Sequence, residues 1–238
     1  MKIRTASLTN RGGRSTNDDT VRIFEGDDST WVYVGDGLGA YAGGQQASQA
    51  AGQALSDAAR GGSLLTDERM LEAAGMANQA VLQLQQQTQG SMKTTLVLLY
   101  IEDGRARWMH VGDSRLYHFS GGWLQSQTMD HSVSQMAVLM GEITRDQIRF
   151  HEDRNRVLRA LGADNARPDL SPTMMLTGGK DAFLLCTDGF WENVYEAEME
   201  QALRAAQSPE EWLSRMEEIL RPRLTESSDN YTAAAVFC

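Results

Sequence analysis

The pattern of apolar and polar positions along the chain predicts short strands that are interrupted by helical segments. Apolar runs that are rich in β-branched and aromatic residues and bounded by Gly, Asp or Asn are typical of strands. Such runs predict strands at residues 2–9, 20–25, 30–35, 93–102, 105–112, 114–119, 182–187 and 231–237. Asp103-Gly104 joins two of them and is a strong hairpin signal. Ser120-Gly121-Gly122 predicts a second tight turn before Trp123.

The remaining periodic segments predict helices at residues 43–59, 66–88, 132–140, 144–161, 194–206 and 208–221. The first is rich in Ala and Gln, which favour helix intrinsically. The last begins with Ser208-Pro209-Glu210-Glu211, which supplies an N-cap, a proline at the first helical position and acidic residues in the first turn.

The order of these elements predicts the fold class. Strands, helices, strands, helices, one strand, two helices and a final strand do not alternate as in a doubly wound parallel sheet, and hairpins require antiparallel pairing. We therefore expect an α+β fold with antiparallel sheets flanked by helices. The chemistry-bearing motifs run from residue 14 to residue 230, so we expect a single domain over residues 1–238.

Composition narrows the class of protein. The chain has 238 residues, of which 41% are hydrophobic and 23% charged, as in ordinary globular proteins with a sizeable core. A net charge of −10 argues against nucleic acid or an anionic membrane as partner. The presence of only two cysteines argues against a disulfide framework and fits a reducing compartment. With no signal-peptide core and no apolar run long enough to span a bilayer, we expect a cytoplasmic protein.

Five short aspartate motifs are the strongest chemical signal in the chain. They are Asn17-Asp18-Asp19, Gly35-Asp36-Gly37, Gly112-Asp113-Ser114, Thr187-Asp188-Gly189 and Asp229-Asn230. At least three of them close an apolar predicted strand, where a carboxylate packs poorly but can bind metal. One such aspartate alone is best interpreted as an ordinary turn residue. Several together indicate carboxylates gathered around hard cations.

Asp19, Asp36, Asp188 and Asp229 are the candidate metal ligands. Mg²⁺ and Mn²⁺ favour carboxylate, carbonyl and water oxygens. Two such ions about 3.5–4 Å apart can share a water and lower its pKa, which makes hydroxide available near neutral pH. Asp36 is the best candidate for a bridging carboxylate, because Gly37 lets the chain turn sharply and leaves its carbonyl open to a metal. Turn or cap aspartates are the alternative interpretation.

Arg14 precedes Asp19 by five residues. A guanidinium group binds phosphate oxygens through two parallel hydrogen bonds and stays charged at any relevant pH. An arginine beside a dimetal centre is what a phosphomonoester hydrolase requires, although a single arginine is usually a surface residue.

These motifs, in this order, resemble the metal-dependent protein serine/threonine phosphatases (type 2C, the PPM family), specifically the compact bacterial members. The matching segments extend over nearly the whole chain: Arg14 to Asp19, Val34 to Gly39, Thr94-Thr95-Leu96, Val111 to Tyr117, Thr128 to Ser132, Asn155 to Gly162, Thr187-Asp188-Gly189 and Asp229 to Thr232. Each segment is a weak signal alone, whereas the set is specific.

The resemblance implies a fold and a set of roles. The fold would be a central antiparallel β-sandwich with helices on both outer faces and a dimetal site at one end. The implied metal ligands are Asp19, Asp36, Asp188, Asp229 and the Gly37 carbonyl, with Asp36 bridging two Mn²⁺ or Mg²⁺ ions. Asp113, together with Asp188, matches the position of a third, weaker ion. Arg14 matches the phosphate-binding arginine, and Asp18 a position that holds metal-bound water. Residues 133–154 match a mobile flap that influences substrate choice.

Three positions depart from the family pattern, of which the mildest is Ala40 in place of a frequent glycine. Leu38 stands where many eukaryotic members carry a histidine proposed as general acid, so water would have to protonate the leaving oxygen. Lys93 stands where the family usually has Gly, and either contacts the substrate or is solvated.

Other reactive side chains fit this chemistry less well. Cys186 lies in an apolar run, which makes a thiol inert. The four histidines, His110, His118, His131 and His151, have no spacing suited to zinc. We expect His131 to order a turn.

The resulting hypothesis is hydrolysis of phosphoserine and phosphothreonine on proteins by a hydroxide that bridges two metal ions, in signal transduction opposite a bacterial Ser/Thr kinase. The expected partners are a phosphorylated protein substrate and a cognate kinase system, and we expect a monomer. The alternatives are a catalytically silent scaffold or binding module with the same fold, and a phosphatase that serves one dedicated phosphoprotein in a regulatory partner switch.

Overall fold

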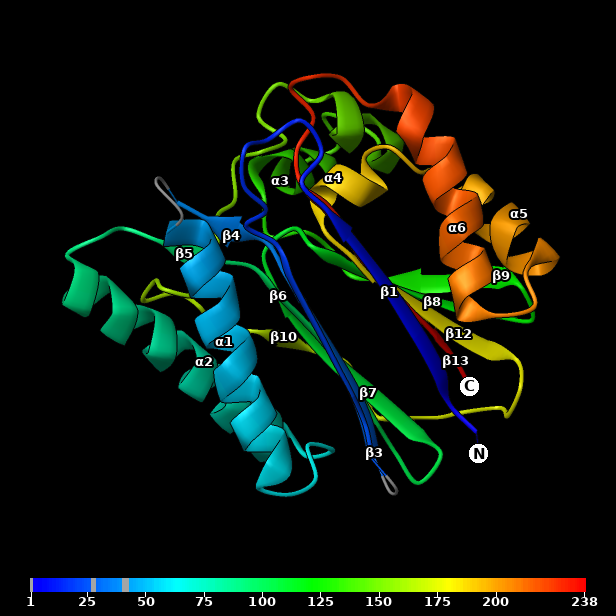
Figure 1. Ribbon diagram of the computed structural model, residues 1–238, viewed down its shortest axis with the longest axis horizontal. Coiled ribbons are helices and arrows are strands. Elements are labelled where there is room, and N and C mark those ends of the chain that lie inside the picture. The colour runs from blue at the N-terminus through cyan, green and yellow to red at the C-terminus, as the bar shows by residue number, and fades with distance from the viewer. Residues whose placement is uncertain (1, 27–28, 40–42) are drawn as a thin grey trace.

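The computed structural model describes residues 2–26, 29–39 and 43–238 and contains two antiparallel sheets packed face to face (Figure 1). The first sheet has the order β1 (Arg4–Asn10), β13 (Tyr231–Phe237), β12 (Asp181–Cys186), β8 (Arg115–Ser120) and β9 (Trp123–Gln127). The second has the order β10 (Asp169–Leu170), β7 (Arg105–Val111), β6 (Leu96–Glu102), β3 (Ser29–Gly35) and β2 (Thr20–Glu25), with β11 (Met174–Met175) also paired to β7. The expected α+β class with a central β-sandwich is confirmed.

Helices cover both outer faces of the sandwich. In Figure 1, α1 (Gly43–Arg60) and α2 (Asp67–Thr88) lie on the left, against the second sheet. On the right, α5 (Glu196–Ala205) and α6 (Pro209–Leu220) lie against the first sheet. Each strand divides its side chains between layers because successive residues point to opposite faces. Val32 and Val34 pack between the sheets, whereas Trp31 and Tyr33 pack under the helices.

The hairpins form where the sequence predicts them. β6 pairs with β7 across Asp103-Gly104, and both turn residues have positive φ, 50° and 70°. This conformation matches the right-handed twist of the flanking strands, and Asp-Gly tolerates it well. Gly121 and Gly122, at φ 59° and 85°, join β8 to β9 in the same way.

The predicted strand at residues 93–102 is in fact divided in two. β5 (Lys93–Thr94) pairs with β4 (Gly37–Leu38) in a small separate sheet, and β6 begins at Leu96. Between them, Thr95 bonds to Asp36 instead: its backbone N–H donates to the Asp36 carbonyl and its Oγ1 accepts from the Asp36 N–H. These bonds to Asp36 interrupt the strand between β5 and β6.

The predicted helix at residues 144–161 is wrong. Only a 3₁₀ turn forms, η1 (Arg145–Phe150), followed by irregular backbone, whereas the preceding α3 (Val133–Leu139) agrees with the prediction at 132–140. Tertiary contacts override the helical pattern, because the buried Arg149 donates to the carbonyl of Trp191 and to Glu196. These hydrogen bonds hold the segment against the rest of the protein at Arg149, so it cannot continue as a straight helix.

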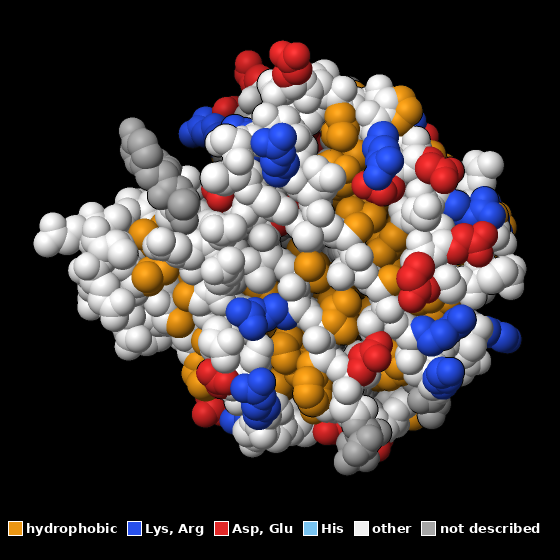
Figure 2. All heavy atoms as spheres, viewed as in Figure 1, with side chains coloured by type: hydrophobic (Ala, Val, Ile, Leu, Met, Phe, Trp, Pro, Cys, Tyr) orange, Lys and Arg blue, Asp and Glu red, His pale blue; other side chains and the backbone are white. Residues whose placement is uncertain are grey.

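Several short elements have no clear sequence signal. β9 alternates exposed and half-buried residues, and β4, β10 and β11 are each two residues long. The same applies to α4 (Asp188–Trp191) and to η2 (Arg221–Arg223). Among the residues that the structure describes, no helix is both long and apolar enough to cross a membrane. Figure 2 shows acidic and basic side chains interspersed over the viewed face.

Candidate metal centre

The predicted ligand aspartates flank strand ends that meet at one end of the sandwich. In the second sheet, the start of β2 at Thr20 lies opposite Gly35, the last residue of β3. In the first sheet, the last residue of β12, Cys186, lies opposite Ala233 near the start of β13. Because neighbouring strands are antiparallel, starts and ends alternate along each edge. The same end of the molecule, where α4 lies in Figure 1, therefore receives Asp19, Asp36, Asp113, Asp188 and Asp229.

The charges of these aspartates act on one another. Burial, followed by the charges of Asp188 and Asp19, holds the pKa of Asp36 well above its usual range. Burial, followed by the charge of Asp113, raises the pKa of Asp188 in the same way. Buried carboxylates that raise one another's pKa form a site that lacks positive charge.

Asp19 and Asp113 are the most deeply buried of the group, at 8% and 3% exposure. Burial raises the pKa of each to about 7. Hydrogen bonds from Thr232 and Thr187 partly offset the effect at Asp19, whereas the charge of the neighbouring Asp130 adds to it at Asp113. Both positions therefore favour a carboxylate only when a cation is near.

A cleft of about 420 Å³ opens at this end of the sandwich. Its walls come from five separate parts of the chain and include Arg14, Asp18, Asp36, Gly37, Asp113, Asp188 and Asp229. Asn155 and Val157, just after the irregular segment that follows η1, close the cleft on a further side. Sequence-distant motifs thus share one cavity.

The donor set fits a hard divalent cation. Within the described residues, three buried carboxylate oxygens have no hydrogen-bond partner: Oδ1 of Asp18, Asp19 and Asp113. A buried oxygen without a partner is costly, and a cation satisfies it. Gly37 also fits a cation site. A Cβ there would lie 2.1 Å from the Gly44 carbonyl oxygen, so only glycine allows the backbone to approach so closely.

Arg14 reaches the cleft but is engaged with one of the candidate ligands. Its Nε and Nη2 donate to Oδ1 and Oδ2 of Asp229 at 3.0 and 2.9 Å. Both side chains remain about half exposed, at 55% and 40%. The guanidinium group thus supplies the positive charge that Asp229 would otherwise receive from a metal.

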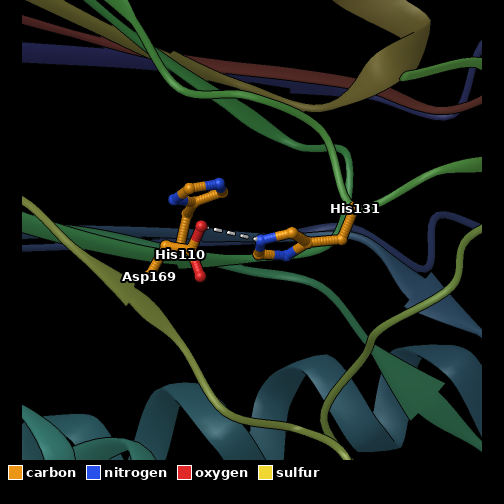
Figure 3. Close-up of side chains that lie close together, drawn as sticks. All are labelled: His110, His131 and Asp169. Carbon is orange, nitrogen blue, oxygen red and sulfur yellow. Dashed lines mark ion pairs between the residues drawn. The ribbon is translucent and has the colours of Figure 1, made fainter. Parts of the chain in front are cut away.

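The tightest cluster of potential ligand atoms lies elsewhere. Among the described residues, His110, His131 and Asp169 form the one group of three His, Cys, Asp or Glu side chains whose ligand atoms all lie within 4.8 Å. Figure 3 shows the Asp169 carboxylate facing the His131 ring, with the His110 ring beside it. The two rings are stacked, with centroids 4.7 Å apart and planes inclined by 10°. Lone pairs in nearly parallel planes cannot converge on one ion at about 2.0–2.1 Å. This cluster is therefore not a metal site in the observed geometry.

Three positioning residues escaped the sequence interpretation. Asn230 is buried, donates to the carbonyls of Arg11 and Thr16, and accepts from the Asp18 N–H, so it fixes the loop that carries Asp18 and Asp19. Thr187 donates from Oγ1 to Asp19 Oδ2 at 2.9 Å. Thr95 holds Asp36. Asn230 and Thr187 lie inside motifs whose aspartates drew attention, and Thr95 lies in the matching segment Thr94-Thr95-Leu96, which was the available signal.

Two of the three positions that depart from the family pattern face each other in the small sheet, where Leu38 pairs with Lys93. The third, Ala40, lies outside the described residues. Leu38 lines the cleft and brings no proton donor to it. Lys93 is exposed. Cys186 is fully buried, and burial raises the pKa of its thiol far above the usual range, in agreement with a role in the core.

Comparisons with known proteins identify the family that the chain resembles. The family model "Protein phosphatase 2C" matches residues 9–229. The serine/threonine phosphatase stp of Listeria welshimeri is 33% identical over 209 residues, which cover 84% of this chain and 82% of that protein.

Solved structures extend the likeness to the whole fold. The serine/threonine phosphatase PstP/Ppp of Mycobacterium tuberculosis superimposes with a TM-score of 0.85 at 30% identity, covering 99% of this chain and 98% of that one. The catalytic domain of the phosphatase PstP in complex with two manganese ions gives a TM-score of 0.82 at 29% identity, covering 99% and 97%. The chain belongs to the protein phosphatase 2C family.

Proposed function

We propose that this protein hydrolyses phosphoserine and phosphothreonine on proteins at a dinuclear Mn²⁺ or Mg²⁺ centre. One observation carries the proposal: several carboxylates, among which the charge of Asp188 raises the pKa of Asp36 and that of Asp113 raises the pKa of Asp188, converge from distant strand ends on a single cleft. The similarity to named serine/threonine phosphatases supports it. A manganese-containing relative supports the choice of metal.

In this proposal the core ligands are Asp19, Asp36, Asp188, Asp229 and the Gly37 carbonyl. Two bound ions would lower the pKa of a shared water and so supply hydroxide near neutral pH. Asp36 would hold both ions, since its charge interacts with those of Asp188, Asp19, Asp113 and Asp229. Thr95 and Thr187 hold Asp36 and Asp19 in place through the hydrogen bonds described above. Asp18, whose Oδ1 has no partner among the described residues, orients water.

Arg14 binds the phosphate group of the substrate. Its bidentate bond to Asp229 has the geometry that a phosphate would also take. With cations held by the cleft, Asp229 would serve as a ligand and the guanidinium group would be available for phosphate oxygens. Arg14 then orients the phosphoryl group and stabilises its negative charge in the transition state.

Asp113, with Asp188, holds a third, weaker ion. Its own burial and unpartnered Oδ1 support this role. Because Leu38 offers no proton, the leaving serine or threonine oxygen takes its proton from water. Residues 133–154 act as a flap that influences substrate choice. Arg154, at the end of this segment, supports the role because it lines a cavity together with Arg14, Asp188 and Asp229.

The wider assignment is part of the same proposal. The protein acts as a single-domain monomer in the cytoplasm, opposite a Ser/Thr kinase, on a phosphorylated protein substrate. The negative net charge supports a partner other than nucleic acid.

The test is release of phosphate from a phosphothreonine peptide by purified protein, with and without Mn²⁺. We expect Mn²⁺-dependent turnover that EDTA abolishes, and a loss on the order of 10²–10³-fold in Asp36→Asn. Asp164→Asn, the same change at an exposed position outside the cleft, is the matched control. Absence of turnover with Mn²⁺, together with a normal Mn²⁺-induced stabilisation, would identify a silent binding module instead.

A further inference from the structure

His131 is bound to the residue that precedes Asp113. The His131 backbone N–H donates to the Gly112 carbonyl at 2.8 Å, and the Gly112 N–H donates to Nδ1 of the His131 ring at 3.1 Å. The second bond requires a lone pair on Nδ1. In a neutral imidazole the proton must then sit on Nε2.

Asp169 faces that proton. Its Oδ2 lies 3.2 Å from His131 Nε2, the interaction drawn as a dashed line in Figure 3. A carboxylate has no proton to donate, so it favours the tautomer with hydrogen on Nε2. Two successive hydrogen bonds thus connect the Asp169 carboxylate to the His131 imidazole and the imidazole to the Gly112 backbone amide.

The opposite tautomer fits the surroundings worse. With hydrogen on Nδ1, the ring could accept from Arg159 Nη1, which lies 3.1 Å from Nε2. The Gly112 N–H would then face another donor, and the Asp169 carboxylate would face a lone pair. Arg159 needs no such bond, because the same Nη1 contacts Asp169 Oδ1 at 2.8 Å and the Arg167 carbonyl at 3.1 Å.

The ring is also neutral, as this arrangement requires. Burial, and then the neighbouring His110, lower the pKa of His131 to about 4. His110 is stacked on His131 and its Nε2 donates to the Met129 carbonyl, so the ring is held on its flat side as well.

The turn at Gly112 leaves little freedom for Asp113. Gly112 has φ 104°, and a Cβ there would lie 2.7 Å from Thr95 Cγ2. On the other side, Trp191 Nε1 donates to the Asp113 carbonyl at 2.9 Å. His131 and Trp191 therefore fix the backbone on either side of the Asp113 Cα.

We propose that His131, oriented by Asp169, is a positioning residue that sets the Gly112–Asp113 turn and thereby the Asp113 carboxylate. The inference rests on the proposed function only in giving Asp113 a metal to bind; the hydrogen-bond arrangement itself can be tested without activity. The effect on metal binding is indirect, through one backbone amide.

The direct test is the tautomer of His131, read from the side-chain ¹⁵N resonances of metal-free protein. We expect hydrogen on Nε2 in the parent protein. Asp169→Asn should move the hydrogen to Nδ1, because Arg159 holds the new amide oxygen and turns the amide NH₂ toward Nε2. Asp164→Asn, an exposed aspartate in the same loop, is the control and should change nothing.

A second measurement connects the tautomer to metal. Asp169→Asn should raise the Mn²⁺ concentration that half-saturates activity by about tenfold, with recovery at high Mn²⁺. His131→Asn should stay near the parent value, because the Asn Oδ1 can take the place of Nδ1 as acceptor. His131→Ala should behave like Asp169→Asn.

Three outcomes would overturn the inference: hydrogen on Nδ1 in the parent protein, a tautomer indifferent to Asp169→Asn, or equal Mn²⁺ dependence of His131→Asn and His131→Ala. Zinc binding that shifts both the His110 and the His131 resonances would also overturn it, in favour of a metal site. An inactive protein with hydrogen on Nε2 that moves in Asp169→Asn would refute the proposed function and leave the arrangement intact.

Discussion

Two clusters of buried charge lie side by side in this molecule, and they are compensated in opposite ways. Arg115 and Asp130 have side chains only 2% exposed and share two hydrogen bonds at 2.8 and 2.7 Å. The guanidinium group also lies 3.4 Å over the Trp191 ring. Two residues before Arg115, Asp113 belongs to a cluster of aspartates whose pKa values are raised.

The two clusters differ in the source of the positive charge that compensates their carboxylates. The Arg115–Asp130 pair is neutral within the chain, so its contribution to folding is independent of metal. The aspartate cleft has one such pair, Arg14–Asp229, and an excess of carboxylates without a cationic partner. A buried charge with its partner is a structural element, whereas a group of like charges without one is a candidate binding site. Four predictions test this contrast.

The largest expected effect comes from Asp130→Asn, which leaves Arg115 buried without its counter-charge. We expect the free energy of unfolding to fall by about 3–5 kcal/mol, equally in metal-free and Mn²⁺-saturated protein. Urea denaturation in both conditions measures it. A loss confined to the Mn²⁺-saturated state would mean that Asp130 serves the metal rather than the fold.

Mn²⁺ should produce the next largest effect, because it binds the folded state alone. At a free concentration one hundred times its dissociation constant, we expect stabilisation by about 2.7 kcal/mol per site. Asp130→Asn should keep this increment, and Asp19→Asn should lose most of it. Thermal or urea unfolding with and without Mn²⁺ is the measurement, and an equal increment in both variants would contradict the separation of the two clusters.

An Asp→Asn substitution should change the free energy of unfolding in opposite directions in the two clusters. At pH 8 without metal, Asp36→Asn removes one of several repelling charges, and we expect the folded state to gain about 1–2 kcal/mol. Asp130→Asn loses stability under the same conditions. Parallel urea titrations of the two variants decide the matter, and destabilisation by both would show that Asp36 is already compensated.

The last prediction is a pH dependence. The pKa of Asp19 and of Asp113 is about 7 in the folded state, above the value of about 3.9 in the unfolded chain. The folded state therefore binds more protons between these values, and metal-free stability should fall as pH rises from about 4 to 7 and level off above. Each titrating carboxylate contributes at most about 1.4 kcal/mol per pH unit.

The measurement is the difference between the pH–stability curves of the parent and of Asp19→Asn/Asp113→Asn, both without metal. Taking a difference removes the contributions of carboxylates elsewhere in the fold. A difference that is independent of pH would contradict the uncompensated burial of these two groups.

Much of the site could be predicted from the chain because its chemistry is local. An aspartate at the end of an apolar run is conspicuous, and Asp36, Asp113 and Asp188 were found in this way. The Asp-Gly hairpin was predictable for a similar reason, since two adjacent residues define the turn. The resemblance of the ordered motifs then predicted the sandwich.

Positioning residues were harder to predict because their partners are distant in sequence. Asn230 bonds to Arg11 and Thr16, more than two hundred residues away. The irregular segment after η1 could not be predicted from periodicity, since Arg149 finds its partners in Trp191 and Glu196 only after folding. The bond between Arg14 and Asp229 likewise depends on the two ends of the chain meeting.

The sequence by itself determined which side chains carry the chemistry and which strands they follow. Alternation of apolar residues places an aspartate at a strand end regardless of what lies opposite. Only the tertiary structure decided which charges are compensated. Arg115 is paired because Asp130 folds against it, and Asp36 is not, because its neighbours are Asp188 and Asp19. Electrostatic free energy depends on distance and burial, and both are properties of the folded chain.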